Sequence, residues 1–191
     1  MKKDLGVKPY LFPMPVLIIV TYSEDGTPDA MNAAYGTLCD FRHIALYLSA
    51  GHKTVANIKA RKAFTVAIAD ERHLIQCDYV GLVSANTDKE KIGKSGFTLT
   101  KSKNVDAPVI EDLPLTLECK LDYIDEKSGA IYGEIVNIIA EEGILTDGNV
   151  DLNKLNPISY DPASRCYFRM GGKVGTAFHD GAALKKIIIT G

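Results

Sequence analysis

The sequence lacks a long hydrophobic run. Near the start of the chain the longest apolar stretch, Val16 to Val20, is far too short to cross a bilayer. It is not preceded by the basic segment, hydrophobic segment and cleavage site of a secretory signal. We therefore expect a protein that is not bound to membranes and resides in the cytoplasm.

An excess of charge of one sign is missing too. The 22 basic and 24 acidic residues leave a net charge of −2 and are scattered along the whole length. A protein that binds a polyanion usually carries a basic patch or stripe. We therefore do not expect a nucleic-acid partner.

Cysteine is scarce and nowhere forms a Cys-x-x-Cys pair. The four cysteines stand singly, with no histidine at metal-ligand spacing: Cys39, Cys77, Cys119 and Cys166. Free thiols and the absence of a metal site are the expectation. Two interpretations of Cys39 stay open, a reactive thiol or a small buried side chain. Three histidines lack a triad or metal partner and are assigned no role: His43, His73 and His179.

Two common nucleotide-binding motifs are also absent. The chain contains neither Gly-x-Gly-x-x-Gly nor Gly-x-x-x-x-Gly-Lys-Ser/Thr, and it shows no internal repeat. What is present is the composition of an ordinary globular domain, with 191 residues of which 46% are hydrophobic and 24% charged. We expect one domain over residues 1–191. Within it, residues 156–191 are rich in Gly, Pro and aromatic residues and are predicted to form a wrapping C-terminal tail.

Strand patterns dominate the chain. A β-branched run from Val16 to Tyr22 ends at Asp25-Gly26, a pair that supplies the positive φ of a tight hairpin. Further strands are predicted over 44–49, 63–69, 115–125 and 130–140, the last two joined by a turn at 127–129. Helices are predicted over 52–61, with Thr54 as N-cap, over 71–83, and as a turn or two over 88–94. This order predicts a mainly β fold, an antiparallel barrel with accessory helices.

The segment from Ser49 to Asn57 has the character of a phosphate site. It places a strand end, a glycine, a cation and a hydroxyl at the start of a helix, where free N–H groups and the helix dipole favour an anion. Lys53 would add a charge and Thr54 a hydrogen bond. Taken alone, the segment is equally compatible with Thr54 as a simple N-cap and Lys53 as a solvated charge.

A second segment, Met31 to Gly36, follows the predicted opening hairpin. Its small residues surround Asn32, and a backbone lined by alanine and glycine lets a flat ring approach closely. Together the two segments indicate a ligand with a phosphate at one end and a ring at the other.

At this point the sequence resembles the flavin reductase-like family, the FMN-binding split barrels that include flavoredoxins. The resemblance runs nearly end to end. It rests on the segments 28–34, 52–58, 64–66, 77–84 and 172–178, which read PDAMNAA, HKTVANI, FTV, CDYVGLVS and GKVGTAF.

The resemblance implies an antiparallel split β-barrel and a homodimer with an FMN at each of two sites near the subunit interface. The FMN-binding residues that follow from the two segments and the resemblance are Asn32, Ala33, Ala34, Tyr35, Gly36, Ser49, His52, Lys53, Thr54, Asn57, Ser84, Asn86, Lys89 and Tyr167.

Three of these assignments have a structural alternative. Lys89 would otherwise be an exposed helical lysine paired with Asp88 or Glu90, and the two tyrosines, Tyr35 and Tyr167, would otherwise be core aromatics. The chain departs from the family at residues 39–43, where many relatives have a Pro-rich turn, and at Ala85, where glycine is common.

Three functions are compatible with bound FMN. No catalytic side chain is required, because the flavin carries the redox chemistry. The first function is an NAD(P)H-dependent flavin reductase that passes electrons to free flavin or another small acceptor, with NADH or NADPH as donor. The others are a flavoredoxin-like electron carrier without nicotinamide turnover and a non-enzymatic FMN-binding module.

Overall fold

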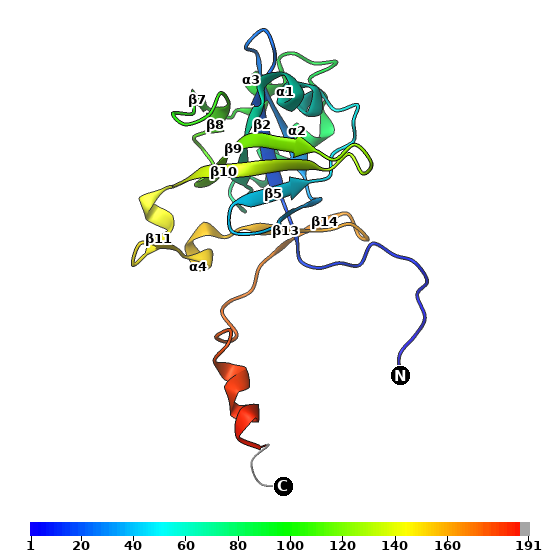
Figure 1. Ribbon diagram of the computed structural model, residues 1–191, viewed down its shortest axis with the longest axis vertical. Coiled ribbons are helices and arrows are strands. Elements are labelled where there is room, and N and C mark those ends of the chain that lie inside the picture. Colours follow the sequence, from blue (N-terminus) through cyan, green and yellow to red (C-terminus); the bar gives the residue numbers. More distant parts are fainter. Residues whose placement is uncertain (188–191) are drawn as a thin grey trace.

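A computed structural model describes residues 1–187 of the chain (Figure 1). A curled sheet of seven strands forms the body, and all of its neighbouring pairs are antiparallel. In sheet order the strands are β3 (Pro28–Ala33), β2 (Leu17–Tyr22), β6 (Ala63–Ile68), β9 (Leu115–Ile124), β10 (Ile131–Ala140), β5 (His43–Leu46) and β4 (Gly36–Leu38). The predicted mainly β, antiparallel architecture is confirmed.

The two predicted hairpins are both present. Strands β2 and β3 pair from Leu17 opposite Ala33 to Tyr22 opposite Pro28, and Gly26 turns the chain at φ +85°. Strands β9 and β10 pair along their lengths, with register shifts between Tyr132 and Gly133 and between Ile135 and Asn137. These pairings follow from local signals, because each turn lies within a few residues of the strands it joins.

One predicted strand, 44–49, is shorter than expected. Strand β5 ends at Leu46, although the Tyr47 N–H still donates to the Tyr35 carbonyl at 2.8 Å in the register of the pairing with β4. The Ser49 carbonyl then accepts the His52 N–H at 3.0 Å, and this turn leads the chain into the first helix.

The helices lie beside the sheet and not between its strands. They are α1 (Lys53–Arg61), α2 (Leu74–Leu82), α3 (Lys91–Ser95) and α4 (Leu152–Leu155), with 3-10 turns η1 (Glu142–Ile144) and η2 (Asp180–Ile187). The predicted N-cap was wrong: His52 occupies that position, and Thr54 lies inside the first turn. The physical reason is that the Thr54 hydroxyl bonds to Asp29 and not to the backbone of its own helix.

Hydrophobic clusters cover both faces of the sheet. Val55 and Ile58 of α1 belong to one cluster, together with the fully buried Phe64. Cys77 and Val80 of α2 belong to the other, together with Ile18. The alternation along β2 sends successive side chains into opposite clusters, so the sheet is buried on both sides.

Three small sheets complete the fold. They consist of β1 (Met14–Pro15), β13 (Ile158–Asp161) and β14 (Cys166–Arg169), of β7 (Leu99–Lys101) and β8 (Pro108–Ile110), and of β11 (Leu145–Thr146) and β12 (Asn149–Val150). None of the described helices is long and apolar enough to cross a membrane.

The predicted C-terminal tail, 156–191, has two parts. Strands β13 and β14 pair with each other, and β13 pairs with β1 against the body. After β14 the chain runs away from the body, as does the N-terminal arm (Figure 1). Within one protomer, the described part of this second segment therefore does not wrap around the barrel. Residues 188–191 lie outside the described residues.

Candidate functional site

Two adjacent pockets lie between β3, the start of α1 and the end of α2, and together they are called the groove. The groove consists of a wide end of about 330 Å³ and a narrow end of about 170 Å³. Five residues line both ends: Met31, Asn32, His52, Gly81 and Leu82. Because the ends share these walls, one elongated ligand can occupy both.

Ten of the fourteen predicted site residues line this groove. The wide end has Asn32, Ala33, Ala34, Tyr35, Ser49, His52 and Tyr167, and the narrow end adds Lys53, Thr54 and Ser84. The two predicted segments, which are separated by β4 and β5 in the chain, therefore meet at one site.

Four predicted residues do not line the groove. Asn57 is a buried residue of α1, and its side-chain amide donates to Thr21 Oγ1 of β2 at 3.0 Å. Gly36 lies in β4, packed against the side chains of Leu17 and Leu46. The Asn86 amide donates to the Gly51 carbonyl at 3.3 Å, which ties together the two loops beside the narrow end. For these three, the structure supplies a role in the fold.

Lys89, the fourth, is exposed and also outside the groove. Its alternative role was an ion pair with Asp88 or Glu90, but Lys94 takes that role at 2.7 and 3.5 Å. The lysine of this region that does line the narrow end is Lys91.

The narrow end presents backbone N–H groups and a cation. Among the described residues, the N–H groups of Lys53 and Thr54 donate to no backbone carbonyl, whereas that of Val55 donates to His52 at 3.1 Å. The free N–H groups and the positive end of the helix dipole face the groove, and the half-buried Lys53 lies beside them. This arrangement suits a phosphate.

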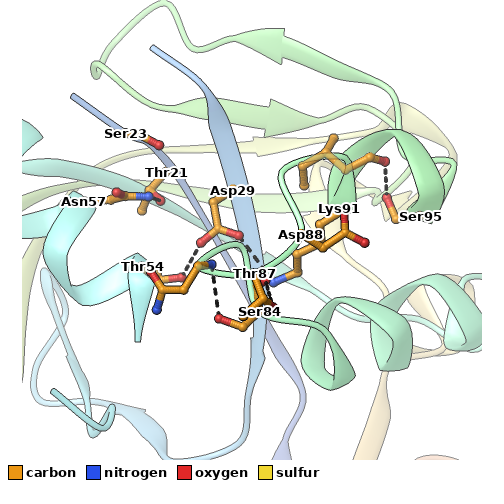
Figure 2. Close-up of polar contacts among 12 residues, drawn as sticks. Thr21, Ser23, Asp29, Thr54, Asn57, Ser84, Thr87, Asp88, Lys91 and Ser95 are labelled. Atoms are coloured by element: carbon orange, nitrogen blue, oxygen red, sulfur yellow. Dashed lines mark hydrogen bonds and ion pairs between the residues drawn. The ribbon is translucent and has the colours of Figure 1, made fainter. Parts of the chain in front are cut away.

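A buried ionic cluster supports the narrow end (Figure 2). Asp29 of β3 accepts the Thr54 hydroxyl at 2.8 Å through Oδ2 and pairs with Lys91 Nζ of α3 at 3.3 Å through Oδ1. The side chains of Asp29 and Lys91 are only 3% and 4% exposed. The cluster thus joins β3, α1 and α3 at the narrow end, which Asp29, Thr54 and Lys91 all help to line.

The cluster changes the role predicted for Thr54. Its hydroxyl has a single proton, which it donates to Asp29, so a phosphate could not receive that proton. Its backbone N–H is the group left for an anion. Sequence reasoning assigned no role to Asp29 or Lys91, because they are 62 residues apart and nothing local shows that they meet.

The wide end combines small residues with tyrosines. Ala33 and Ala34 leave one wall flat, and Tyr35, Tyr47, Tyr160 and Tyr167 surround it. The Tyr167 hydroxyl is part of a hydrogen-bond network, so this tyrosine is more than a core aromatic. It donates to Asp78 Oδ1 at 2.7 Å and accepts from Asn32 Nδ2 at 3.3 Å. Burial, followed by the hydrogen bond to Asp78, raises the pKa of Tyr167.

Close packing holds α2 against β3. Asn32 Nδ2 also donates to the Cys77 carbonyl at 3.1 Å, and a Cβ added at Gly81 would lie 2.9 Å from Asn32 Cβ. Any larger residue at position 81 would push the helix from the strand. The glycine is therefore required for the shape of the groove.

Residues assigned no role lie elsewhere. The rings of His43, His73 and His179 each bond to a nearby aspartate, and none lines the groove. Cys39 is exposed outside it. The segment 39–43, where the chain departs from the family, is stabilised by Asp40 and also lies outside the groove, whereas Ala85 lines the narrow end.

The comparisons with known proteins identify the family and the fold. Residues 10–159 match the family model of the flavin reductase like domain. The fold is similar to that of the flavoredoxin of Desulfovibrio vulgaris (Miyazaki F), with a TM-score of 0.91, 33% identity, and coverage of 95% of this chain and 100% of that one. A flavoredoxin from Methanosarcina acetivorans has a TM-score of 0.87 at 23% identity, covering 96% and 100%. An FMN-binding domain of a flavin reductases-like enzyme from Shewanella baltica has 0.76 at 20% identity, covering 85% and 88%.

The chain belongs to the flavin reductase-like family. Its curled antiparallel sheet is the split barrel of that family, as the sequence predicted.

Replacing Lys91 with methionine tests the buried cluster. This change leaves the Asp29 carboxylate buried without its cation, so we expect the free energy of unfolding to fall by about 3–5 kcal/mol in urea denaturation. Lys94→Met removes an exposed ion pair from the same helix and should have little effect. Adding Asp29→Asn to Lys91→Met should recover much of the loss. Equal effects of the two lysine substitutions would contradict the assignment.

Proposed function

We propose that the chain is an FMN-binding flavoprotein, and that it acts as an NAD(P)H-dependent flavin reductase. One observation carries the FMN proposal. The narrow end of the groove is suited to binding a phosphate, and the wide end has a wall of small residues surrounded by tyrosines. FMN has a phosphate at one end and a planar ring system at the other. The family membership supports the same cofactor.

The phosphate belongs at the narrow end. The N–H groups of Lys53 and Thr54 would donate to it, and the Lys53 ammonium would balance its charge. Asp29 also lines the narrow end, but Lys91 neutralises it, so this carboxylate does not cancel Lys53. The isoalloxazine would lie along residues 32–35, where the alanines allow close approach.

When bound, FMN supplies the redox chemistry. The chain contributes binding, orientation and exclusion of water: α1 holds the phosphate, while Asn32 and the tyrosines confine the ring. A reductase needs an open ring face on which a nicotinamide can stack within about 3–3.5 Å of the reacting atom. The wide end is open enough for this, because Tyr35 and Tyr47 are each about half exposed.

Lys53→Met tests the FMN proposal. Loss of one charged contact to the phosphate should weaken FMN binding about 10- to 100-fold, as measured by quenching of flavin fluorescence. Riboflavin, which has the ring but no phosphate, should bind the variant and the unchanged protein equally. Lys59→Met, an exposed lysine on the same helix, is the matched control. An equal loss for riboflavin would place the phosphate elsewhere, and absence of flavin binding by the unchanged protein would refute the proposal.

The second candidate is a flavoredoxin-like electron carrier. It is favoured by the 33% identity with the Desulfovibrio flavoredoxin over nearly the whole chain. A binding module without electron transfer is the third candidate.

Turnover separates the reductase from the carrier. We expect the FMN-loaded protein with excess free flavin to oxidise many equivalents of NADH or NADPH, measured by the loss of nicotinamide absorbance. A carrier would be reduced by dithionite or a protein donor, and would leave both nicotinamides unoxidised. Protein that holds FMN but accepts electrons from no donor would be a binding module.

We also propose that the protein is a homodimer. Apolar side chains are exposed along β4, the loop after it and β10, where Leu38, Phe41 and Ile138 are all more than half exposed. Such residues are typical of an interface that a second copy covers.

Light scattering during size exclusion tests the dimer. We expect twice the 20.8 kDa of one chain. Leu38→Glu combined with Phe41→Glu should shift the mass toward one chain, because charges would be buried at the interface. Ile75→Glu, which also changes an exposed apolar residue, is the control. A monomeric unchanged protein would refute the proposal.

A further inference from the structure

The wide end of the groove contains a carboxylate that the phosphate and the flavin ring do not require. Asp78, in α2, lines the wide end and is half-buried. Its Oδ1 accepts the Tyr167 hydroxyl, and among the described residues Oδ2 has no hydrogen-bond partner. Among residues 1–187, Thr116 Oγ1 is the only fully buried side-chain oxygen or nitrogen that lacks a hydrogen-bond partner, so Asp78 Oδ2 is not fully buried. Asp78 Oδ2 is therefore open to the groove or to solvent.

The charge of Asp78 is not balanced nearby. No lysine or arginine is among the residues that line the wide end, and no described cation forms a salt bridge with Asp78. At the narrow end, by contrast, Lys91 balances Asp29, and Lys53 adds a further positive charge. A ligand group at the wide end therefore meets a hydrogen-bond acceptor with negative charge, which favours N–H donors and disfavours anions.

The Asp78 side chain is held in one orientation. The Tyr167 hydroxyl, from β14, donates its single proton to Oδ1 and is itself held by Asn32 of β3. Tyr160 packs against Tyr167 with ring centroids 5.8 Å apart. Three separate elements thus fix the carboxylate, and a preorganised acceptor discriminates better between ligands than a mobile one.

We propose that Asp78 is the specificity-determining residue for the electron donor, and that its Oδ2 accepts a hydrogen bond from the carboxamide NH₂ of the nicotinamide. This inference rests on the proposed reductase function. The carboxamide is the N–H donor that the nicotinamide ring carries, and it has no negative charge that the carboxylate would repel. Tyr167 and Asn32 act as positioning residues through their contacts with Asp78 and with each other.

The test compares two donors and two variants of the FMN-loaded full chain. The donors are NADH and reduced 3-acetylpyridine adenine dinucleotide, in which a methyl group replaces the NH₂. We expect the unchanged protein to prefer NADH in kcat/KM by about 10-fold or more, because the acetyl group leaves the acceptor unpaired. Asp78→Asn should reduce this ratio to near one. The asparagine oxygen would still accept from Tyr167, so its NH₂ would face the substrate NH₂.

A binding measurement gives a readout that does not depend on turnover. The non-reducing analogue 1,4,5,6-tetrahydro-NADH keeps the carboxamide, and its dissociation constant can be obtained from the change that it causes in the flavin absorbance. We expect Asp78→Asn to weaken binding of the analogue about 10-fold or more, and to change the affinity for FMN by less than this. Tyr167→Phe should give a smaller loss, because the carboxylate remains but is less well oriented. Asp122→Asn, an exposed residue of β9, is the control.

The outcomes separate this inference from the proposed function. If the unchanged protein oxidises NADH but does not distinguish the two donors, Asp78 does not recognise the amide, and the reductase function stands. The same holds if Asp78→Asn keeps the full preference. If neither NADH nor NADPH is oxidised and the analogue does not bind, the reductase function fails, and this inference fails with it. If Asp78→Asn does not fold, the donor preference of the unchanged protein decides alone.

Discussion

The ion pair between Asp29 and Lys91 is the constraint on which the site depends. Burying either charge alone would cost several kcal/mol, so the strand that carries Asp29 and the helix that carries Lys91 must stay together. The Thr54 hydroxyl binds the same carboxylate and thereby fixes the first turn of α1. The N–H groups of that turn then face the groove. The geometry of the narrow end is thus set by a buried cluster that forms part of its own lining.

The wide end is built on the other side of the same strand. Asn32, three residues after Asp29, contacts the Cys77 carbonyl and the Tyr167 hydroxyl, and Gly81 lets α2 approach it closely. Strand β3 therefore contributes to both ends of the groove, with Asp29 facing α1 and α3 and Asn32 facing α2 and β14. A shift of β3 would disturb both ends together, which explains why buried polar contacts hold it on each side.

The sequence predicted those parts of the fold and site that depend on neighbouring residues. Asp25-Gly26 marked the first hairpin, and a glycine, a lysine and a helix start marked the narrow end. It did not predict contacts between distant residues, because nothing in the local pattern shows which side chains will meet. Asp29 and Lys91 are 62 residues apart, and Asp78 and Tyr167 are 89 apart. For the same reason Asn57 was predicted as a ligand, although its amide binds Thr21 under the helix.

The charges along the groove impose a direction on any ligand. A phosphate is attracted by Lys53 and the helix dipole at the narrow end and repelled by Asp78 at the wide end. Reversal of a bound FMN would place its phosphate beside an unbalanced carboxylate and remove it from Lys53. Both changes are unfavourable, so the groove selects one orientation before any specific contact with the ring is made. In that orientation the ring lies next to the carboxylate, where a second ligand can be recognised.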